Sequence, residues 1–145
     1  MSKFGYPYAP FALPSTFPLP PNPPIDRPIL TARLELSGGP YCNILALADS
    51  GADVCLFSLR MARSLGLNLA ALPRSVTTGL GSAEHTTYYA TVTVDIGNGL
   101  RFETRGGFTQ GMNSAGFGLL GQIGFFENHN VEFRHRDRIF TIESA

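Results

Sequence analysis

Asp49 is the acidic residue whose surroundings most favour chemistry. It follows a continuous apolar stretch, residues 44–48, and Ser50 and Gly51 come directly after it. A carboxylate at the end of a buried strand costs free energy unless a partner or a function compensates for its burial. The serine supplies a hydroxyl that can brace the turn, and the glycine lets the backbone turn sharply and bring its amide close to the acid. The sequence therefore predicts a positioned carboxylate, which can serve in general acid–base chemistry.

Two strands and a helix are expected to hold this acid in place. Residues 29–36 alternate loosely between apolar and polar side chains, as a half-buried strand does. Residues 41–48 form a nearly unbroken apolar run, which is typical of a strand covered on both faces. Beyond the acid, Ser58 is expected to cap a short helix over residues 59–65, and Gly66 is expected to end it.

Turn-forming residues divide the second half of the chain into hairpins. The expected strands are residues 88–96, 100–104, 130–133 and 139–143. The turn Gly97-Asn98-Gly99 joins the first two, because Asn-Gly between strands is a strong hairpin signal. A short helix-like piece is expected up to Phe126. Short strands, one or two short helices and frequent glycine turns predict a mostly-β, barrel-like domain.

Prolines set the first 28 residues apart, since nine of the 11 prolines fall there. Proline lacks the backbone donor and fixes φ, so this stretch is not expected to form a helix or a central strand. We expect an extended, polyproline-like arm over residues 1–28 and the folded domain over residues 29–145. The residues leave three roles open for the arm: a tail, a docking arm for a partner, or a propeptide over an active site.

The order of these elements resembles that of the retropepsin-like aspartic proteases, in particular the bacterial single-domain members. An apolar strand, Asp49-Ser50-Gly51-Ala52, a short helix, a glycine-bearing hairpin and Gly118-Leu119-Leu120-Gly121 follow one another along residues 29–143. The resemblance implies a closed β-barrel of the acid protease fold, with one lobe per chain. It also implies a catalytic element made of Asp49, Ser50 and Gly51, with the apolar-apolar-Gly element packed behind it. In this family the hydroxyl residue interlocks with its symmetry mate.

The same resemblance implies which residues contact a substrate. The expected substrate-binding residues are Ala52, Asp53, Gly79, Leu80 and Gly81. Asp53 falls where many retroviral members keep an acid that contacts the substrate backbone. Residues 77–82 correspond to the flap, a β-hairpin that covers the substrate. The chain departs from the family after Gly121, where Gln122-Ile123 stands in place of the usual charged residue and its ion pairs.

Peptide hydrolysis by this route needs two carboxylates that share one proton. Like charges about 3 Å apart do not both ionise readily, so such a pair titrates as a unit. Asp95-Ile96-Gly97 mimics the spacing but lacks the hydroxyl, and a hairpin end already explains it. The second carboxylate is therefore expected from Asp49 of a second chain across a two-fold axis, which makes the enzyme a homodimer. The alternative is a retropepsin-like module that dimerises or binds peptides without turnover, since a fold alone does not establish activity.

Composition and charge argue against other classes of protein. At 145 residues the chain has the length of one domain. Lys+Arg and Asp+Glu each number 11, and a net charge of zero argues against a nucleic-acid partner. No apolar run is long enough for a membrane span, and no apolar core of a signal peptide follows Lys3. We therefore expect a cytoplasmic enzyme that acts on peptide or protein substrates.

Histidines and cysteines offer weaker candidates for chemistry. The histidines are His85, His129 and His135, and their spacing is not that of metal ligands. Cys42 and Cys55 are expected to be small buried apolar residues with reduced thiols. A Cys–His nucleophile pair stays open, although no local signature supports it. Neither a metal nor a cofactor is expected.

Overall fold

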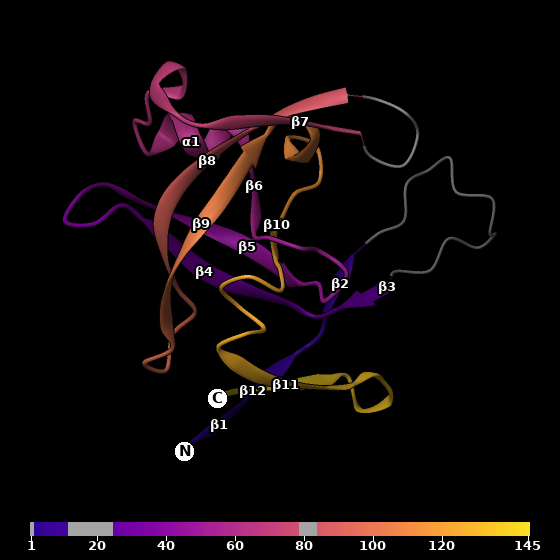
Figure 1. Ribbon diagram of the computed structural model, residues 1–145. Coiled ribbons are helices and arrows are strands. Elements are labelled where there is room, and N and C mark those ends of the chain that lie inside the picture. The colour runs from indigo at the N-terminus through magenta and orange to yellow at the C-terminus, as the bar shows by residue number, and fades with distance from the viewer. Residues whose placement is uncertain (1, 12–24, 79–83) are drawn as a thin grey trace, which may run out of the picture.

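A mixed sheet contains most of the β-strands in the computed structural model, which describes residues 2–11, 25–78 and 84–145. The sheet order is β4-β5-β10-β6-β9-β8-β7 (Figure 1). Its strands are β4 (Ile29–Glu35), β5 (Tyr41–Ala48), β6 (Leu56–Ser58), β7 (Arg74–Thr78), β8 (Glu84–Asp95), β9 (Arg101–Thr109) and β10 (Gly118–Leu120). β4 also pairs with β8, with Leu34 opposite Val94, so the pairings of six strands run round in a ring. The mostly-β fold class is confirmed, and the closed barrel stays a prediction.

The strand that leads to Asp49 is covered on one face only, so the prediction of a strand buried on both faces is wrong. Along β5, Ile44, Ala46 and Ala48 are buried, whereas Leu45 is 40% exposed. The alternation arises because successive side chains of a strand point to opposite faces, and here only one face packs on the core. The other face is open in the single chain.

One short α-helix, α1 (Leu59–Ser64), follows β6 as expected. The Ser58 hydroxyl accepts a hydrogen bond from the Met61 backbone N–H, and Gly66 has a φ of +73° just past the helix end. The second helix expected up to Phe126 is wrong, because Ile123 makes an isolated β-bridge to Val54 and residues 124–128 form turns. Gly124 has a φ of +96° there, which a helix does not allow. No helix in the described part of the chain has both the length and the apolar character that a membrane crossing requires.

The described residues also contain three short 3-10 helices: η1 (Leu69–Ala71), η2 (Gln110–Met112) and η3 (His135–Asp137). The expected central hairpin is confirmed, with longer strands than its sequence pattern suggested. β8 and β9 pair antiparallel from Thr87↔Thr109 to Asp95↔Arg101 around the predicted glycine turn, where Gly97, Asn98 and Gly99 all have positive φ. The hairpin end is therefore fixed by backbone conformations that glycine and asparagine adopt at low cost.

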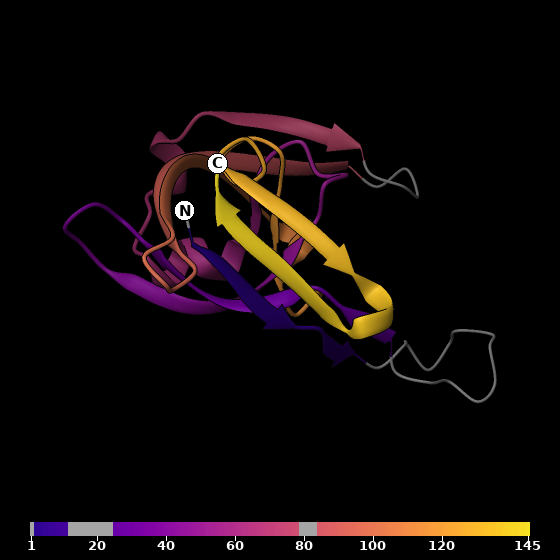
Figure 2. The same ribbon diagram turned by 90° about the horizontal axis from the view of Figure 1, so that it is seen from below.

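The N-terminal segment contributes strands, which corrects the expectation of polyproline-like chain for the residues concerned. β1 (Lys3–Pro7) pairs antiparallel with β12 (Ile139–Ser144), which also pairs with β11 (His129–Arg134) in the confirmed last hairpin. β2 (Ala9–Phe11) pairs with β3 (Ile25–Arg27). Figure 2 shows β1 alongside this hairpin, with both chain ends at the same small sheet. β1 lies at the sheet edge, where a strand tolerates proline.

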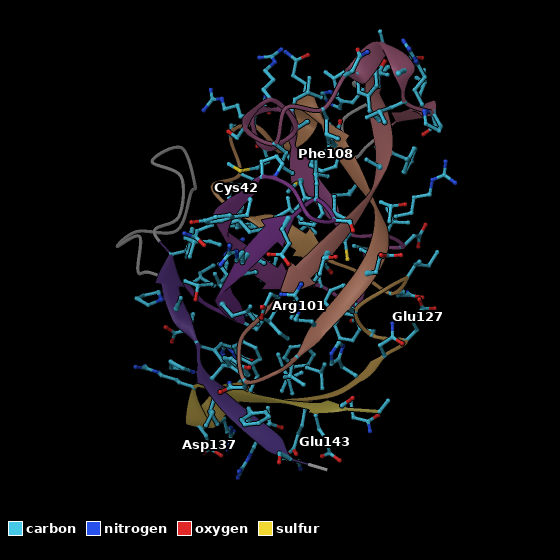
Figure 3. The ribbon with its side chains drawn as sticks, turned by 90° about the vertical axis from the view of Figure 1, so that its left-hand side faces the viewer. Cys42, Arg101, Phe108, Glu127, Asp137 and Glu143 are labelled. Atoms are coloured by element: carbon cyan, nitrogen blue, oxygen red, sulfur yellow. The ribbon has the colours of Figure 1, made fainter. Side chains whose placement is uncertain are left out.

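Phe57 of β6 is the centre around which the site-bearing strands pack. Its side chain is 1% exposed and its ring lies 5.5 Å from that of Phe108, which Figure 3 labels on β9. A Cβ atom at Gly106 or at Gly118 would lie 2.8 Å from the Phe57 ring. Glycine at both places lets β9 and β10 approach this ring closely, which fixes β10 next to β5 and thereby the position of Asp49.

Candidate active site

Asp49 stands at the carboxyl end of β5, between two neighbouring strands. β10 pairs parallel with β5, with Leu119 opposite Leu47. The Asp49 backbone N–H donates to the Leu120 carbonyl at 3.0 Å, and the Ala48 N–H donates to the Pro28 carbonyl on the other side at 3.0 Å. The backbone that carries the carboxylate is thus bonded on both sides, so the acid projects from a rigid support.

The turn after the strand orients the carboxylate. The Gly51 backbone N–H donates to Asp49 Oδ1 at 2.9 Å, and the Ala52 N–H donates to the Asp49 carbonyl at 3.1 Å. A Cβ atom at Gly51 would lie 3.2 Å from Oδ1, so glycine gives the acid its room. Asp49 is half-buried and Ser50 and Gly51 are exposed. The predicted element Asp49-Ser50-Gly51 therefore forms one compact turn whose acid is held by a backbone amide.

Gln122 braces this turn from behind. Its side-chain Nε2 donates to the Ser50 carbonyl at 2.9 Å, and its backbone N–H donates to the Ala52 carbonyl at 2.8 Å. Where the sequence departs from the family's usual charged residue, a neutral hydrogen bond supports the loop. In the described residues, the hydrogen bonds that hold the turn come from the Gln122 side chain and from the backbone. The sequence analysis expected the Ser50 hydroxyl to hold it.

Gly121 lies directly against the backbone of the loop that follows Asp49. A Cβ atom there would lie 2.4 Å from the Val54 carbonyl oxygen and 2.7 Å from that of Ala52. No side chain fits at such distances, so the apolar-apolar-Gly element packs behind the loop as the resemblance implied. The Ile123 backbone N–H extends this contact by donating to the Asp53 carbonyl at 2.9 Å.

Cys55 is a supporting residue whose place the sequence analysis missed. It is fully buried, and its Sγ accepts a hydrogen bond from the Gly121 backbone N–H at 3.4 Å. Burial raises the pKa of this thiol to about 11, so it is neutral near pH 7 and is a poor nucleophile. Burial also raises the pKa of the Cys42 thiol. These shifts argue against a cysteine nucleophile.

Exposed residues surround the acid on the side away from the core. Ser50, Gly51, Asp53 and Gln122 are exposed, and Ile123 is 51% exposed although it is apolar. The structure thus places Asp53 next to the Asp49-Ser50-Gly51 turn, while Ala52 is half-buried.

β7 and β8 form the hairpin expected for the flap, with Arg74 opposite Tyr88 and Thr78 opposite Glu84. The proposed substrate contacts Gly79, Leu80 and Gly81 lie outside the described residues. Figure 1 shows the two strands projecting together from the larger sheet.

Asp95 does not serve as the second acid within one chain. Its Oδ1 accepts from the Gly97 backbone N–H at 2.9 Å and its Oδ2 accepts from the Arg101 guanidinium at 3.0 Å. Asp95 of β8 pairs with Arg33 of β4, which in turn pairs with Asn43 at the start of β5. Six residues of strand, about 20 Å, separate that point from Asp49.

Metal ligands do not gather in the described part of the chain, where no group of three His, Cys, Asp or Glu side chains could hold an ion. The buried His129 ring stacks on Phe125, with ring centroids 5.1 Å apart, and its Nδ1 lies 2.8 Å from the Phe125 carbonyl oxygen. This histidine is a packed core residue.

Comparisons with known proteins agree with this geometry. The sequence model of the aspartyl protease family matches residues 32–122, which include the Asp49-Ser50-Gly51 turn and Gly121. No curated protein sequence matches the chain. The structure is similar to that of a retropepsin-like aspartic protease from Rickettsia conorii, with a TM-score of 0.60 and 14% identity over 97% of this chain and 98% of that one. A match over most of the chain to the family and a fold shared along its full length lead to one conclusion: the chain belongs to the aspartyl protease family and has the retropepsin-like fold.

Proposed function

We propose that the protein is an aspartic endopeptidase that works as a homodimer, with Asp49 of each subunit forming the catalytic pair. The observation that carries the proposal is the Asp49 turn, in which a half-buried carboxylate at the end of β5 is held at 2.9 Å by the Gly51 amide. The aspartyl protease family match over the same residues supports it. One chain supplies one such acid, so the reaction requires a second copy.

The two carboxylates would share one proton between them. One takes a proton from a water molecule as the water oxygen attacks the peptide carbonyl carbon, and the other donates its proton to the carbonyl oxygen. Collapse of the resulting tetrahedral intermediate breaks the C–N bond. The leaving amine takes the proton that the first carboxylate had removed from water, and a hydroxyl of the intermediate returns a proton to the other carboxylate, so the pair again holds one proton. The hydrogen bond from the Gly51 backbone N–H to Asp49 Oδ1 keeps one oxygen of each acid in a fixed direction during these steps.

The surface around the acid supports the dimer. Ser50, Gly51 and Ile123 are exposed, and a second copy that approaches Asp49 along a two-fold axis would cover them. Ala52, Asp53 and the tip residues Gly79, Leu80 and Gly81 of the β7–β8 hairpin are proposed to contact an extended peptide substrate, with the hairpin closing over it as a flap.

Asp49→Asn tests the proposal with little change in shape. The parent protein is expected to cleave members of a peptide library at acidic pH and to be inhibited by a transition-state-like aspartic protease inhibitor. The variant should lose cleavage while light scattering still reports the dimer mass. Cleavage by the variant at the parent's rate would contradict the proposal, and a folded dimeric parent that cleaves nothing would favour the non-catalytic peptide-binding module.

A further inference from the structure

Within the part of the chain that the structure describes, the start of β5 presents a free strand edge. Two hydrogen bonds flank the β4–β5 ladder, from the Ala48 N–H to Pro28 O at 3.0 Å and from the Leu36 N–H to Pro40 O at 3.1 Å. In an antiparallel ladder, every second residue directs both its N–H and its C=O to the same neighbour. The even-numbered residues of β5 are therefore bonded to β4, and Asn43 and Leu45 direct their backbone groups to the opposite edge.

β10 occupies only the last part of that opposite edge. Its pairing with β5 begins at Gly118↔Ala46 and ends at Leu120↔Ala48. The bond from the Asp49 N–H to Leu120 O, at 3.0 Å, confirms that the odd-numbered residues face this side. The parallel pairing of Gly118 with Ala46 uses the Leu45 carbonyl, so within residues 2–11, 25–78 and 84–145 no strand pairs with Asn43 or with the Leu45 N–H on this edge. A free edge of this kind is a template for an added strand.

A cavity of about 310 Å³ opens at this edge. Its apolar lining consists of Ile44, Leu45, Phe57, Met61, Met112 and Phe117. The volume is at the small end of ligand pockets and suits one large apolar side chain together with its backbone. Met61 also contacts Cys42, which Figure 3 labels, with 3.7 Å between the two sulfur atoms. Methionines adapt to side chains of different shape, so the cavity favours an apolar residue without demanding one type.

The charge at the cavity is positive. Arg60 is the one charged residue among those that line it, and its side chain is exposed on the first turn of α1. Arg27 adds a second cation nearby, because its guanidinium lies 5.6 Å from the centre of the Phe117 ring. A carboxylate on a bound segment would therefore be attracted to this rim.

We infer that an extended segment of the substrate protein, with an apolar residue next to an acidic one, binds as an added strand at Asn43–Leu45. The backbone edge, the apolar cavity and the Arg60 charge are three separate features that suit one such segment. Its role in substrate capture rests on the proposed protease function. Leu45 and Asp49 are four residues apart, about 13 Å along a strand, so this exosite lies away from the bond that is cut.

The test measures binding to the full-length Asp49→Asn protein, which is not expected to cleave the probe. Fluorescence anisotropy follows a fluorescein-labelled peptide, Gly-Thr-Glu-Leu-Thr-Gly, and its counterpart with Lys in place of Glu. The Glu peptide should bind more tightly than the Lys peptide. Arg60→Glu should weaken the binding of the Glu peptide about fivefold, which is the size of effect expected for an exposed charge pair. Arg63→Glu makes the same charge change on α1 outside the cavity lining and should leave binding unchanged.

A backbone variant tests the added strand. Asn43→Pro removes an N–H that points to the free edge and not to β4, so the ladder is kept and binding should weaken about fivefold. Asn43→Ala keeps the N–H and should bind more tightly than the proline variant. Equal binding of both peptides, or equal binding by Arg60→Glu and the parent, would overturn the inference.

Two further outcomes separate this site from the proposed activity. The inference would be overturned if the peptide does not bind measurably up to about 1 mM and Asn43→Pro changes the mass of the assembly in solution. These two results together would indicate that copies of the chain pair with each other through this edge. If the Glu peptide binds as expected but the parent cleaves no peptide, the peptide site is supported while the protease function and the substrate role are refuted. If the parent cleaves peptides but the probe does not bind, the exosite alone is refuted.

Discussion

Gly121→Ala is the substitution that most directly probes how the catalytic turn is supported. The new Cβ atom would lie 2.4 Å from the Val54 carbonyl oxygen and 2.7 Å from the Ala52 one, and neither backbone atom can rotate away. The loop must therefore move as a whole, which stretches the 2.8 Å bond from the Gln122 N–H to Ala52 O. Overpacking costs about 1–3 kcal/mol and the weakened hydrogen bond costs about 1 kcal/mol. Together they predict that the free energy of unfolding falls by about 2–4 kcal/mol.

For a domain of this length, such a loss corresponds to a fall in Tm of about 5–15 °C. Differential scanning calorimetry and the peptide-cleavage assay should both report the change, because the displaced loop carries Asp49. Gly39→Ala is the matched control, since the nearest atom to its new Cβ, Leu36 Cβ, is 3.6 Å away. Gly39→Ala should melt within about 2 °C of the parent. If Gly121→Ala does the same and keeps its activity, the account of the loop's support is wrong.

Two other predictions concern residues behind the turn. The pKa of Cys55 is raised to about 11 in the folded protein, so the folded state holds the thiol proton more tightly than the unfolded state. The stability that the protonated thiol contributes is therefore fully present below about pH 9 and is lost as the pH rises toward 11. Urea unfolding measures the free energy of unfolding at pH 7 and at pH 10. Between these pH values the parent should lose about 1.4 kcal/mol more of this free energy than Cys55→Ala loses, and equal losses would refute the burial argument. Gln122→Ala removes the 2.9 Å bond to the Ser50 carbonyl and should cost about 0.5–1 kcal/mol of stability together with part of the activity. Thermal melting and initial rates, compared with Gln110→Ala at an exposed site away from the turn, check this, and a variant as active and stable as the parent would contradict the bracing role.

Local sequence signals predicted the local structure well. Ser58 and Gly66 mark the ends of α1 because capping depends on the few residues that make the cap. The turn at Asn98 was predictable for the same reason, since its glycine neighbours carry the positive φ values themselves. The Asp49-Ser50-Gly51 turn belongs to this class, because the bond from Gly51 to the acid spans only two residues.

Long-range packing could not be predicted from the same signals. The exposure of Leu45 depends on whether another element packs on the outer face of β5, and such packing joins residues that are far apart in the chain. The sequence run looked buried on both faces because apolar residues also line open cavities and surfaces that another molecule covers. The hydrogen bond from Gly121 to Cys55 likewise joins distant segments, so a cysteine without a paired partner gave no hint of its place.

The turns before Asn128 show a different limit. An apolar stretch up to Phe126 suggested helix, but Gly124 lies so close to Thr104 that a Cβ atom there would be 2.4 Å from its Oγ1. Tertiary contact and a positive φ at that glycine therefore override the helical pattern. For β1, the strand is formed by pairing with β12 at the other end of the chain, so its own proline-bearing sequence did not reveal it.

The central claim, that two copies of Asp49 make one active site, is tested most directly by mixing subunits. Parent and Asp49→Asn chains, carrying different tags, are unfolded together in equal amounts and refolded so that dimers form at random. If each active site needs an acid from both chains, the mixture should keep about one quarter of the activity of the same amount of parent protein, because only parent–parent dimers work. An activity of about one half would show that each chain works with its own acid alone, and would contradict the claim.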